Sequence, residues 1–115
     1  MKTLIILNDP PYGTERTYNG LRLAHAMAKA GSDVTIFMLA DAVASAKQGQ
    51  RTPEGFYNIE RMVGRVLSSR GVVLLCGTCM DARGIAESEL IDGTRRSDMT
   101  ALAEATAAAD KVLTF

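Results

Sequence analysis

The chain has 115 residues, of which 47% are hydrophobic and 23% are charged, and its 13 basic and 13 acidic side chains give a net charge of zero. That length predicts a single domain over residues 1–115 with a substantial buried core. The neutral charge argues against a nucleic-acid partner, because phosphate binding needs a basic surplus. No apolar run approaches the roughly 18 residues of a membrane span, and the apolar block at residues 4–7 is too short for a signal peptide. We therefore expect a cytoplasmic protein with no membrane partner.

The first half of the chain alternates apolar runs with helical patterns. A β-branched and leucine-rich run ends at a loop that contains Pro10 and Pro11. In the next segment, apolar residues recur at helical spacing after Thr14, a potential N-cap, and Gly31 closes the helix. A second apolar run precedes a short Ala-rich segment that Asp41 is expected to cap. These elements are a strand at 2–8, a helix at 15–30, a strand at 33–39 and a short helix at 41–47.

The second half continues the same alternation after a loop at residues 48–55. Asn58 is expected to open a helix that Gly71 closes, and an unbroken apolar strand follows at 72–75. Such a run is typical of a strand with both faces covered. Ser97 is expected to cap the last helix. The remaining elements are a loop at 76–84, a short helix at 85–92, a helix at 97–109 and a strand at 111–115.

Strands that alternate with helices at this spacing predict βαβ units, which join right-handed into a parallel sheet. The fold class is therefore α/β. Ligands of open α/β sheets bind beyond the carboxyl ends of the strands. From this geometry alone, Asn8, Tyr12 and Asp41 become candidates for a pocket, since each follows the end of an expected strand.

The two cysteines, Cys76 and Cys79, are the main chemical feature, because they follow the buried strand at 72–75. A helix N-terminus and backbone N–H groups lower the pKa of a nearby thiol and raise its thiolate fraction. Arg83 is expected to add positive charge, whereas Asp81 would oppose it or cap the helix expected after Gly84. The pattern favours a nucleophilic or persulfide-carrying cysteine.

Other interpretations of the cysteine pair remain open. Tetrahedral zinc needs four ligands, but the chain has one Cys-x-x-Cys motif and one histidine, His25, so we expect no metal. A structural disulfide across so short a loop gains little entropy in a reducing compartment. A thioredoxin-type redox pair and two inert packed thiols both stay possible.

The loop at residues 8–14 precedes a helix and has the position of an anion-binding loop. Only Thr14 and Thr17 supply hydroxyl groups there, so a tight turn shaped by the prolines is the simpler interpretation. Flavin binding would also need aromatic planes, and the chain has no Trp and only three Tyr. We expect no cofactor.

Seven short motifs occur in order along nearly the whole chain. They are DPPYGTE at 9–15, LRLA at 21–24, DAV at 41–43, YNI at 57–59, CGTCMDARG at 76–84, LIDG at 90–93 and ADKVLTF at 109–115. Together they resemble YchN-like proteins of the DsrE/DsrF-like (DsrEFH) superfamily of sulfur-relay proteins. The resemblance implies a three-layer α/β/α fold with a mostly parallel sheet of about five strands. It also implies a homo-oligomer, a hexamer in the YchN-like branch.

In the sulfur-relay members, a cysteine after a central strand receives sulfur as a persulfide. That cysteine lies eight residues before the glycine of a basic-Gly pair, as Cys76 lies before Gly84 of the Arg83–Gly84 pair. The resemblance therefore implies this role for Cys76, with Cys79 as an additional thiol and with sulfur donor and acceptor proteins as partners.

Three functional hypotheses follow. The first is a small sulfur carrier or sulfurtransferase that holds a persulfide on the Cys76/Cys79 loop. The second is an oligomeric protein that binds a small ligand or anion without catalysis, in which the cysteines are incidental. The third is a thiol–disulfide switch in which Cys76 and Cys79 pair reversibly. The sequence does not decide whether the protein is an enzyme.

Overall fold

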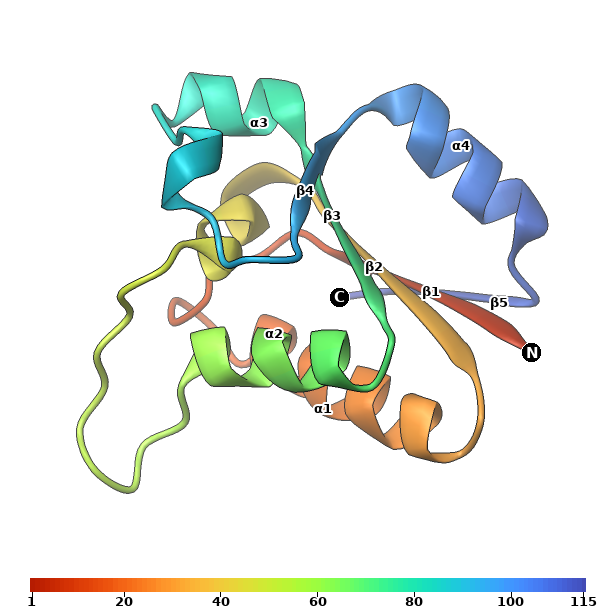
Figure 1. The fold of residues 1–115 in the computed structure, drawn as a ribbon, viewed down its shortest axis with the longest axis horizontal. Coiled ribbons are helices and arrows are strands. Elements are labelled where there is room, and N and C mark those ends of the chain that lie inside the picture. Colours follow the sequence, from red (N-terminus) through yellow and green to blue (C-terminus); the bar gives the residue numbers. More distant parts are fainter.

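The computed structural model describes residues 1–115 and forms one five-stranded parallel sheet with helices on both faces (Figure 1). The predicted α/β class and the three-layer arrangement are therefore confirmed. The strands are β1 (Lys2–Leu7), β2 (Asp33–Met38), β3 (Val72–Cys76), β4 (Arg95–Ser97) and β5 (Lys111–Thr114). The helices are α1 (Arg16–Lys29), α2 (Ile59–Ser68), α3 (Gly77–Ala82) and α4 (Met99–Ala108), with 3₁₀ turns η1 (Ala40–Ala46) and η2 (Glu87–Glu89).

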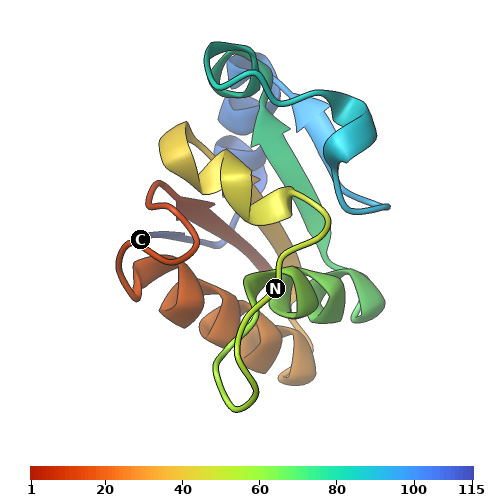
Figure 2. The same ribbon diagram turned by 90° about the vertical axis from the view of Figure 1, so that its left-hand side faces the viewer.

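The strand order is β4-β3-β2-β1-β5, and every neighbouring pair is parallel. From β1 to β4 the chain moves one strand at a time in one direction, and it then crosses back to place β5 beside β1. Right-handed crossovers in opposite directions put their helices on opposite faces of a sheet. Accordingly, α1 and α2 pack on one face and α4 packs on the other (Figures 1 and 2).

The core lies mainly between the sheet and the α1/α2 layer. Side chains alternate along each strand, so Ile5, Leu7, Ile36 and Leu75 share the face toward these helices, and all four are fully buried. Gly20 of α1 lets this helix approach closely, because an added Cβ there would lie 2.5 Å from Leu7 Cδ2. The close packing of Gly20 against Leu7 therefore determines the position of α1 over β1.

Two helix boundaries follow the expected chemistry. Asn58 is the N-cap of α2, where its side chain accepts a hydrogen bond from the backbone N–H of Arg61. Gly31 has a φ of +94° just after α1, in the left-handed region that glycine adopts without a Cβ penalty. Both predictions are confirmed.

The segment after β3 differs from the prediction. Residues 76–84 were expected to form a loop, yet α3 begins directly after Cys76. The helix expected at 85–92 is only the three-residue turn η2. A six-residue helix is too short to show a periodic apolar pattern, and Glu87 and Glu89 leave η2 with no apolar side that would anchor a longer one.

Three smaller expectations are also wrong. The last helix is capped by Asp98, one residue after the expected Ser97, because Ser97 forms the end of the unpredicted strand β4. Asp41 lies inside η1, which has no side-chain cap. Thr14 is not the N-cap of α1, although its hydroxyl accepts a hydrogen bond from the Arg16 N–H. No helix is long and apolar enough to cross a bilayer.

Candidate functional site

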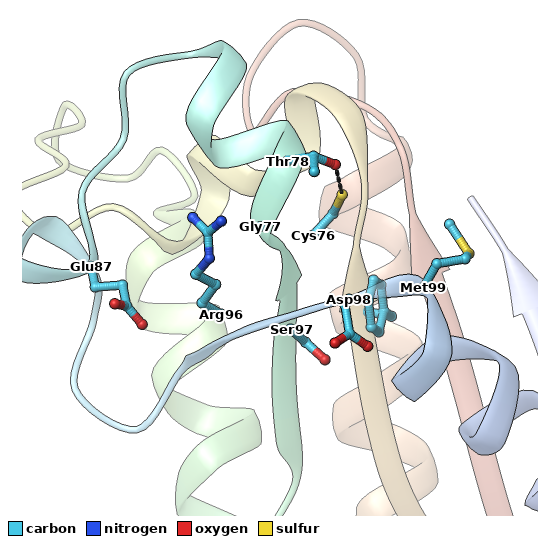
Figure 3. Close-up of a pocket in the computed structure, with 9 residues that line it drawn as sticks. Cys76, Gly77, Thr78, Glu87, Arg96, Ser97, Asp98 and Met99 are labelled. Carbon is cyan, nitrogen blue, oxygen red and sulfur yellow. Dashed lines mark hydrogen bonds between the residues drawn. The ribbon is translucent and has the colours of Figure 1, made fainter.

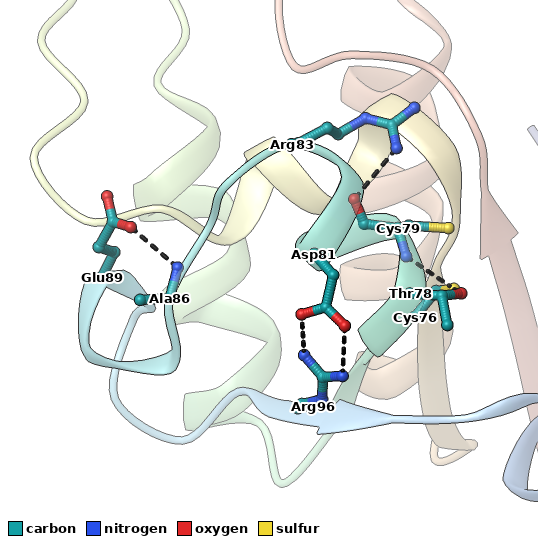
Figure 4. Close-up of polar contacts among 8 residues, drawn as sticks. All are labelled: Cys76, Thr78, Cys79, Asp81, Arg83, Ala86, Glu89 and Arg96. Atoms are coloured by element: carbon teal, nitrogen blue, oxygen red, sulfur yellow. Dashed lines mark hydrogen bonds and ion pairs between the residues drawn. The ribbon is translucent and has the colours of Figure 1, made fainter.

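Cys76 lies where the central strand β3 becomes helix α3. It is both the last residue of β3 and the N-cap of α3, and its thiol is largely buried, with 8% of the residue exposed. The Cys79 backbone N–H donates a hydrogen bond to Cys76 Sγ over 3.4 Å (Figure 4), and the Thr78 hydroxyl lies 3.3 Å from the same sulfur (Figure 3). The chain thus holds this sulfur in one position at the carboxyl edge of the sheet.

These contacts favour the thiolate of Cys76. Burial raises the pKa of the Cys76 thiol, but interactions with the Cys79 and Thr78 side chains and backbone groups outweigh burial and lower the pKa below its ordinary value. A thiolate is the nucleophilic form of cysteine. Cys76 is therefore the better nucleophile of the pair.

Cys79 lies one helical turn along and makes different contacts. Its sulfur accepts a hydrogen bond of 3.2 Å from the backbone N–H of Ala40, at the start of η1. Burial and the neighbouring Cys76 raise the pKa of Cys79 above its ordinary value, despite the opposing effects of the Ala40 N–H and of Arg83. The two thiols therefore differ in character, and Cys79 remains protonated where Cys76 ionises. Both cysteines are free.

A cavity of about 490 Å³ opens beside Cys76, on the face of the sheet that carries α4. The sheet strands β2, β3 and β4 contribute Phe37, Cys76 and Arg96 to its lining. The start of α4 contributes Met99 (Figure 3). Its volume lies in the range of small-molecule sites. The lining residues are Phe37, Cys76, Gly77, Thr78, Glu87, Arg96, Ser97, Asp98 and Met99.

Arg96 of β4 ties the cavity wall to the helix that follows Cys76. Its guanidinium makes a two-pronged ion pair with Asp81 of α3, with distances of 2.7 and 2.9 Å (Figure 4). Gly77 allows this approach, since an added Cβ there would lie 2.7 Å from Arg96 Nε. The Arg96 interaction lowers the pKa of Asp81 below its ordinary value. We expected Asp81 to oppose the charge of Arg83 or to cap a later helix. In the structure it pairs with Arg96 instead.

Arg83 lies on the opposite side of α3 from this ion pair. Its guanidinium contacts an Asp41 carboxylate oxygen at 2.8 and 2.9 Å. The same guanidinium donates to the Cys79 carbonyl at 3.1 Å (Figure 4). Gly84, with a φ of +64°, then turns the chain. The charge of Arg83 therefore acts on Cys79 rather than on Cys76. Only the short turn η2 follows Gly84, so the helix that was expected to supply positive potential there is absent.

The two remaining pocket candidates lie away from Cys76 and do not line its cavity. The Asn8 side chain donates to the Phe115 carbonyl, between β1 and β5. The Tyr12 hydroxyl accepts from the Ile59 N–H and donates to Gln50, which ties the loop after β1 to α2. Both residues therefore join elements of the fold.

Sequence reasoning missed the residues of β4 and α4 that face Cys76. Strand β4 has three residues, two of them arginines, so it carries no alternating apolar signal. One residue could have indicated where α4 begins. Asp98 is a typical N-cap residue, and its side chain accepts a hydrogen bond from the Ala101 N–H. No group of three or more His, Cys, Asp or Glu side chains gathers as a metal site.

A free thiol pair at the carboxyl edge of a doubly wound parallel sheet, beside an open cavity, defines a class of small α/β thiol proteins. Within that class, the chain belongs to the DsrE/DsrF-like family, whose model matches residues 1–115. It is 43% identical to the protein YchN of Escherichia coli strain K12, over 99% of this chain and 98% of that protein.

The comparison with solved structures agrees. The crystal structure of the YchN protein from E. coli superposes with a TM-score of 0.95 at 42% identity, covering 100% of this chain and 99% of that one. A more distant relative, the sulfurtransferase TusD of Salmonella typhi, is 27% identical over the full length of both chains.

Proposed function

We propose that the protein is a sulfur carrier that accepts sulfur on Cys76 as a persulfide. The observation that carries the proposal is the position of the low-pKa Cys76 thiol against an open cavity of about 490 Å³. Membership of the DsrE/DsrF-like family and the similarity to a sulfurtransferase support the same chemistry. We place the carrier in the cytoplasm, where thiols stay reduced.

The loading step is a thiolate displacement. The Cys76 thiolate attacks the outer sulfur of a donor persulfide, a new S–S bond forms on Cys76, and the donor leaves as its own thiolate. Cys76 then carries the sulfane sulfur, which an acceptor thiolate removes by the same displacement. The lowered pKa of Cys76 favours the first step, because the attacking form is populated nearer neutral pH.

Cys79 offers a second fate for the loaded sulfur. Its thiolate can attack the inner sulfur of the Cys76 persulfide, which forms a Cys76–Cys79 disulfide and releases hydrosulfide. The raised pKa of Cys79 slows this reaction, because less of Cys79 is in the attacking thiolate form at neutral pH. We therefore assign Cys76 as the carrier and Cys79 as the neighbouring thiol that limits the lifetime of the persulfide.

The matched variants Cys76→Ser and Cys79→Ser test these roles. Each protein is incubated with glutathione persulfide and examined by mass spectrometry. We expect the wild type and Cys79→Ser to gain one sulfur atom on Cys76, with the longer-lived adduct on Cys79→Ser. Equal loading of Cys76→Ser and the wild type, or no loading of any form while a known carrier loads, would overturn the proposal.

A thiol–disulfide switch is the second candidate, favoured by the hydrogen bond from the Cys79 N–H to Cys76 Sγ, which keeps the two residues adjacent. Glutathione disulfide would oxidise the pair and leave as two glutathione thiols. A reduction potential of the pair near the cytosolic glutathione poise supports this function, and a potential far below it indicates a structural bond instead.

We also propose that the carrier works as a homo-oligomer, in line with the hexamer implied by the family resemblance. The α4 side of the molecule carries incompletely covered apolar side chains, with Met99 62% and Val112 42% exposed. Such side chains are typical of subunit interfaces. Native mass spectrometry should give a mass six times that of the 12.3 kDa chain, and a monomer at micromolar concentration would contradict the assembly.

A further inference from the structure

The outer surface of the α1/α2 layer carries a groove unrelated to the cysteine site, on the opposite face of the sheet from α4 (Figure 1). Two adjoining hollows of about 300 and 180 Å³ form this groove, and they share Arg22, Met62 and Arg65. On α1, Tyr18, Arg22 and His25 follow one another at helical spacing, and Arg61 and Arg65 do so on α2.

The arginines of this groove have no carboxylate partners. The ion pairs of the structure engage Arg16, Lys47, Arg83 and Arg96, and none includes Arg22, Arg61 or Arg65. Three guanidiniums without a carboxylate partner therefore line one groove. Arg22 donates a hydrogen bond of 3.1 Å to Asn19 Oδ1, and its guanidinium lies 5.3 Å from the centroid of the Tyr18 ring. Guanidinium groups bind phosphate and carboxylate groups through paired hydrogen bonds.

The far end of the groove is aromatic. Tyr57 stacks on Phe56 with ring centroids 4.5 Å apart and contacts the Tyr18 ring at 4.3 Å. Phe56 remains 51% exposed, although an apolar ring of this size is normally covered. A planar ring of a ligand would stack on this exposed face.

His25 supplies a separate observation at the basic end. Its Nδ1 atom is buried and has no hydrogen-bond partner within the chain, and the residue lines the smaller hollow with Arg22 and Arg65. Because Nδ1 itself is buried, a ligand in the hollow would contact the rest of the imidazole ring and the two arginines beside it. Glu15, in contrast, lies near enough to Tyr57 to raise its pKa, after the larger effect of burial. Negative charge of a ligand is therefore favoured beside Arg22 and Arg65 and disfavoured at the aromatic end.

We propose that this groove binds an organic phosphate with an aromatic ring, of about the size of a mononucleotide. The ring stacks at Phe56 and Tyr57, and the phosphate lies among the guanidiniums of Arg22, Arg61 and Arg65, at the end of the groove that His25 also lines. The proposal is independent of the chemistry at Cys76, because it uses no residue of that site.

Calorimetric titration of the whole protein with AMP, adenosine and inorganic phosphate tests the proposal. We expect AMP to bind, and adenosine and phosphate each to bind at least tenfold more weakly, since each keeps only half of the contacts. Arg61→Ala/Arg65→Ala should weaken AMP at least tenfold, and Phe56→Ala at least fivefold. The matched control Arg95→Ala, an exposed and unpaired arginine on β4, should leave binding unchanged.

NMR spectra of the imidazole provide a readout at the basic end, where saturating AMP should shift the ring signals of His25. Three results would overturn the proposal: no binding at millimolar AMP, equal affinity for AMP and inorganic phosphate, or unchanged AMP affinity in Arg61→Ala/Arg65→Ala. Arg61 and Arg65 are both exposed, so the double variant should keep the wild-type fold, which circular dichroism measures.

Discussion

The guanidinium of Arg96 occupies the space where a side chain on Gly77 would lie, 2.7 Å from an ideal Cβ. Gly77 is the first residue of α3, directly after Cys76, so this contact joins the edge strand β4 to the cysteine site. The Asp81 carboxylate holds the guanidinium from its other side. Any side chain at position 77 must therefore displace a charged group that is already paired.

The first prediction concerns this contact. Gly77→Ala should lower the free energy of unfolding by up to about 1 kcal/mol, because the flexible Arg96 guanidinium must move and weaken its exposed ion pair with Asp81. Urea denaturation measures the change. The double variant Gly77→Ala/Arg96→Ala should lose less free energy of unfolding than the two single variants together. The reason is that the new Cβ no longer meets the Arg96 guanidinium. Gly64→Ala is the control: its Cβ meets nothing within 4 Å, so this helical substitution should stabilise the protein by about 0.5–1 kcal/mol. Additive effects at Gly77 and Arg96 would contradict the assignment.

The second prediction concerns acid stability. The Arg96 hydrogen bonds lower the pKa of Asp81 from its ordinary value of 3.8. A carboxyl whose pKa is lower in the folded state stabilises the fold above its unfolded pKa and loses that contribution as the pH falls through the folded pKa. Thermal melts should therefore show a wild-type advantage over Asp81→Asn at pH 7 that shrinks below pH 3.8. A constant difference from pH 7 to pH 2 would show that Asp81 acts by packing alone.

The third prediction concerns the reactivity of Cys76. Its rate of alkylation by iodoacetamide, followed at Cys76 of the wild type by peptide mass spectrometry, should rise with pH with a midpoint below the ordinary thiol value of 9.0. Thr78→Val removes a hydroxyl that lies 3.3 Å from the sulfur, and it should move this midpoint to higher pH. Thr106→Val, which removes a hydroxyl bonded to the Leu102 carbonyl in α4, provides the matched control. Equal midpoints for both threonine variants would show that the Thr78 hydroxyl does not lower the pKa of Cys76.

The fourth prediction separates Tyr12 from the chemistry. Tyr12→Phe loses the hydrogen bonds to Gln50 and to the Ile59 N–H, so it should lower the free energy of unfolding by about 1 kcal/mol. Sulfur loading of Cys76 should stay at the wild-type level. Tyr18→Phe serves as the control, because the Tyr18 hydroxyl has no hydrogen-bond partner and its loss should change stability by less than about 0.5 kcal/mol. A loading defect in Tyr12→Phe with unchanged stability would show that Tyr12 takes part in the sulfur loading of Cys76.

The layout of the sheet was largely predictable because its central strands are apolar and its helices have clear ends. The run at 72–75 identified β3, and Asn58 marked the start of α2. Strand β4 was not predictable in the same way, since Arg95 and Arg96 carry no apolar alternation and pair with only one neighbour. Hydrogen bonding to β3, a tertiary effect, determines that strand.

The candidate site shows the same division. Position in the chain identified Cys76 and Cys79, because cysteines after a buried strand lie at its carboxyl edge. The partners of the charged residues depended on which elements come together in space. Arg83 pairs with Asp41, 42 residues away, and Asp81 pairs with Arg96. The residues near each of these charged side chains in the sequence do not indicate its ion-pair partner.

The pairing of β1 with β5 has a consequence for synthesis of the protein. The Asn8 N–H and the Asn8 side chain both donate to the Phe115 carbonyl, and the Phe115 N–H donates to Ile6. Strand β1 therefore acquires its second neighbour only after β5 has been synthesised. Until then β1 presents an open edge, which in a nascent chain is a template for pairing with other chains. Slower synthesis of the segment between β1 and β5 should thus lengthen the time for which this edge is exposed.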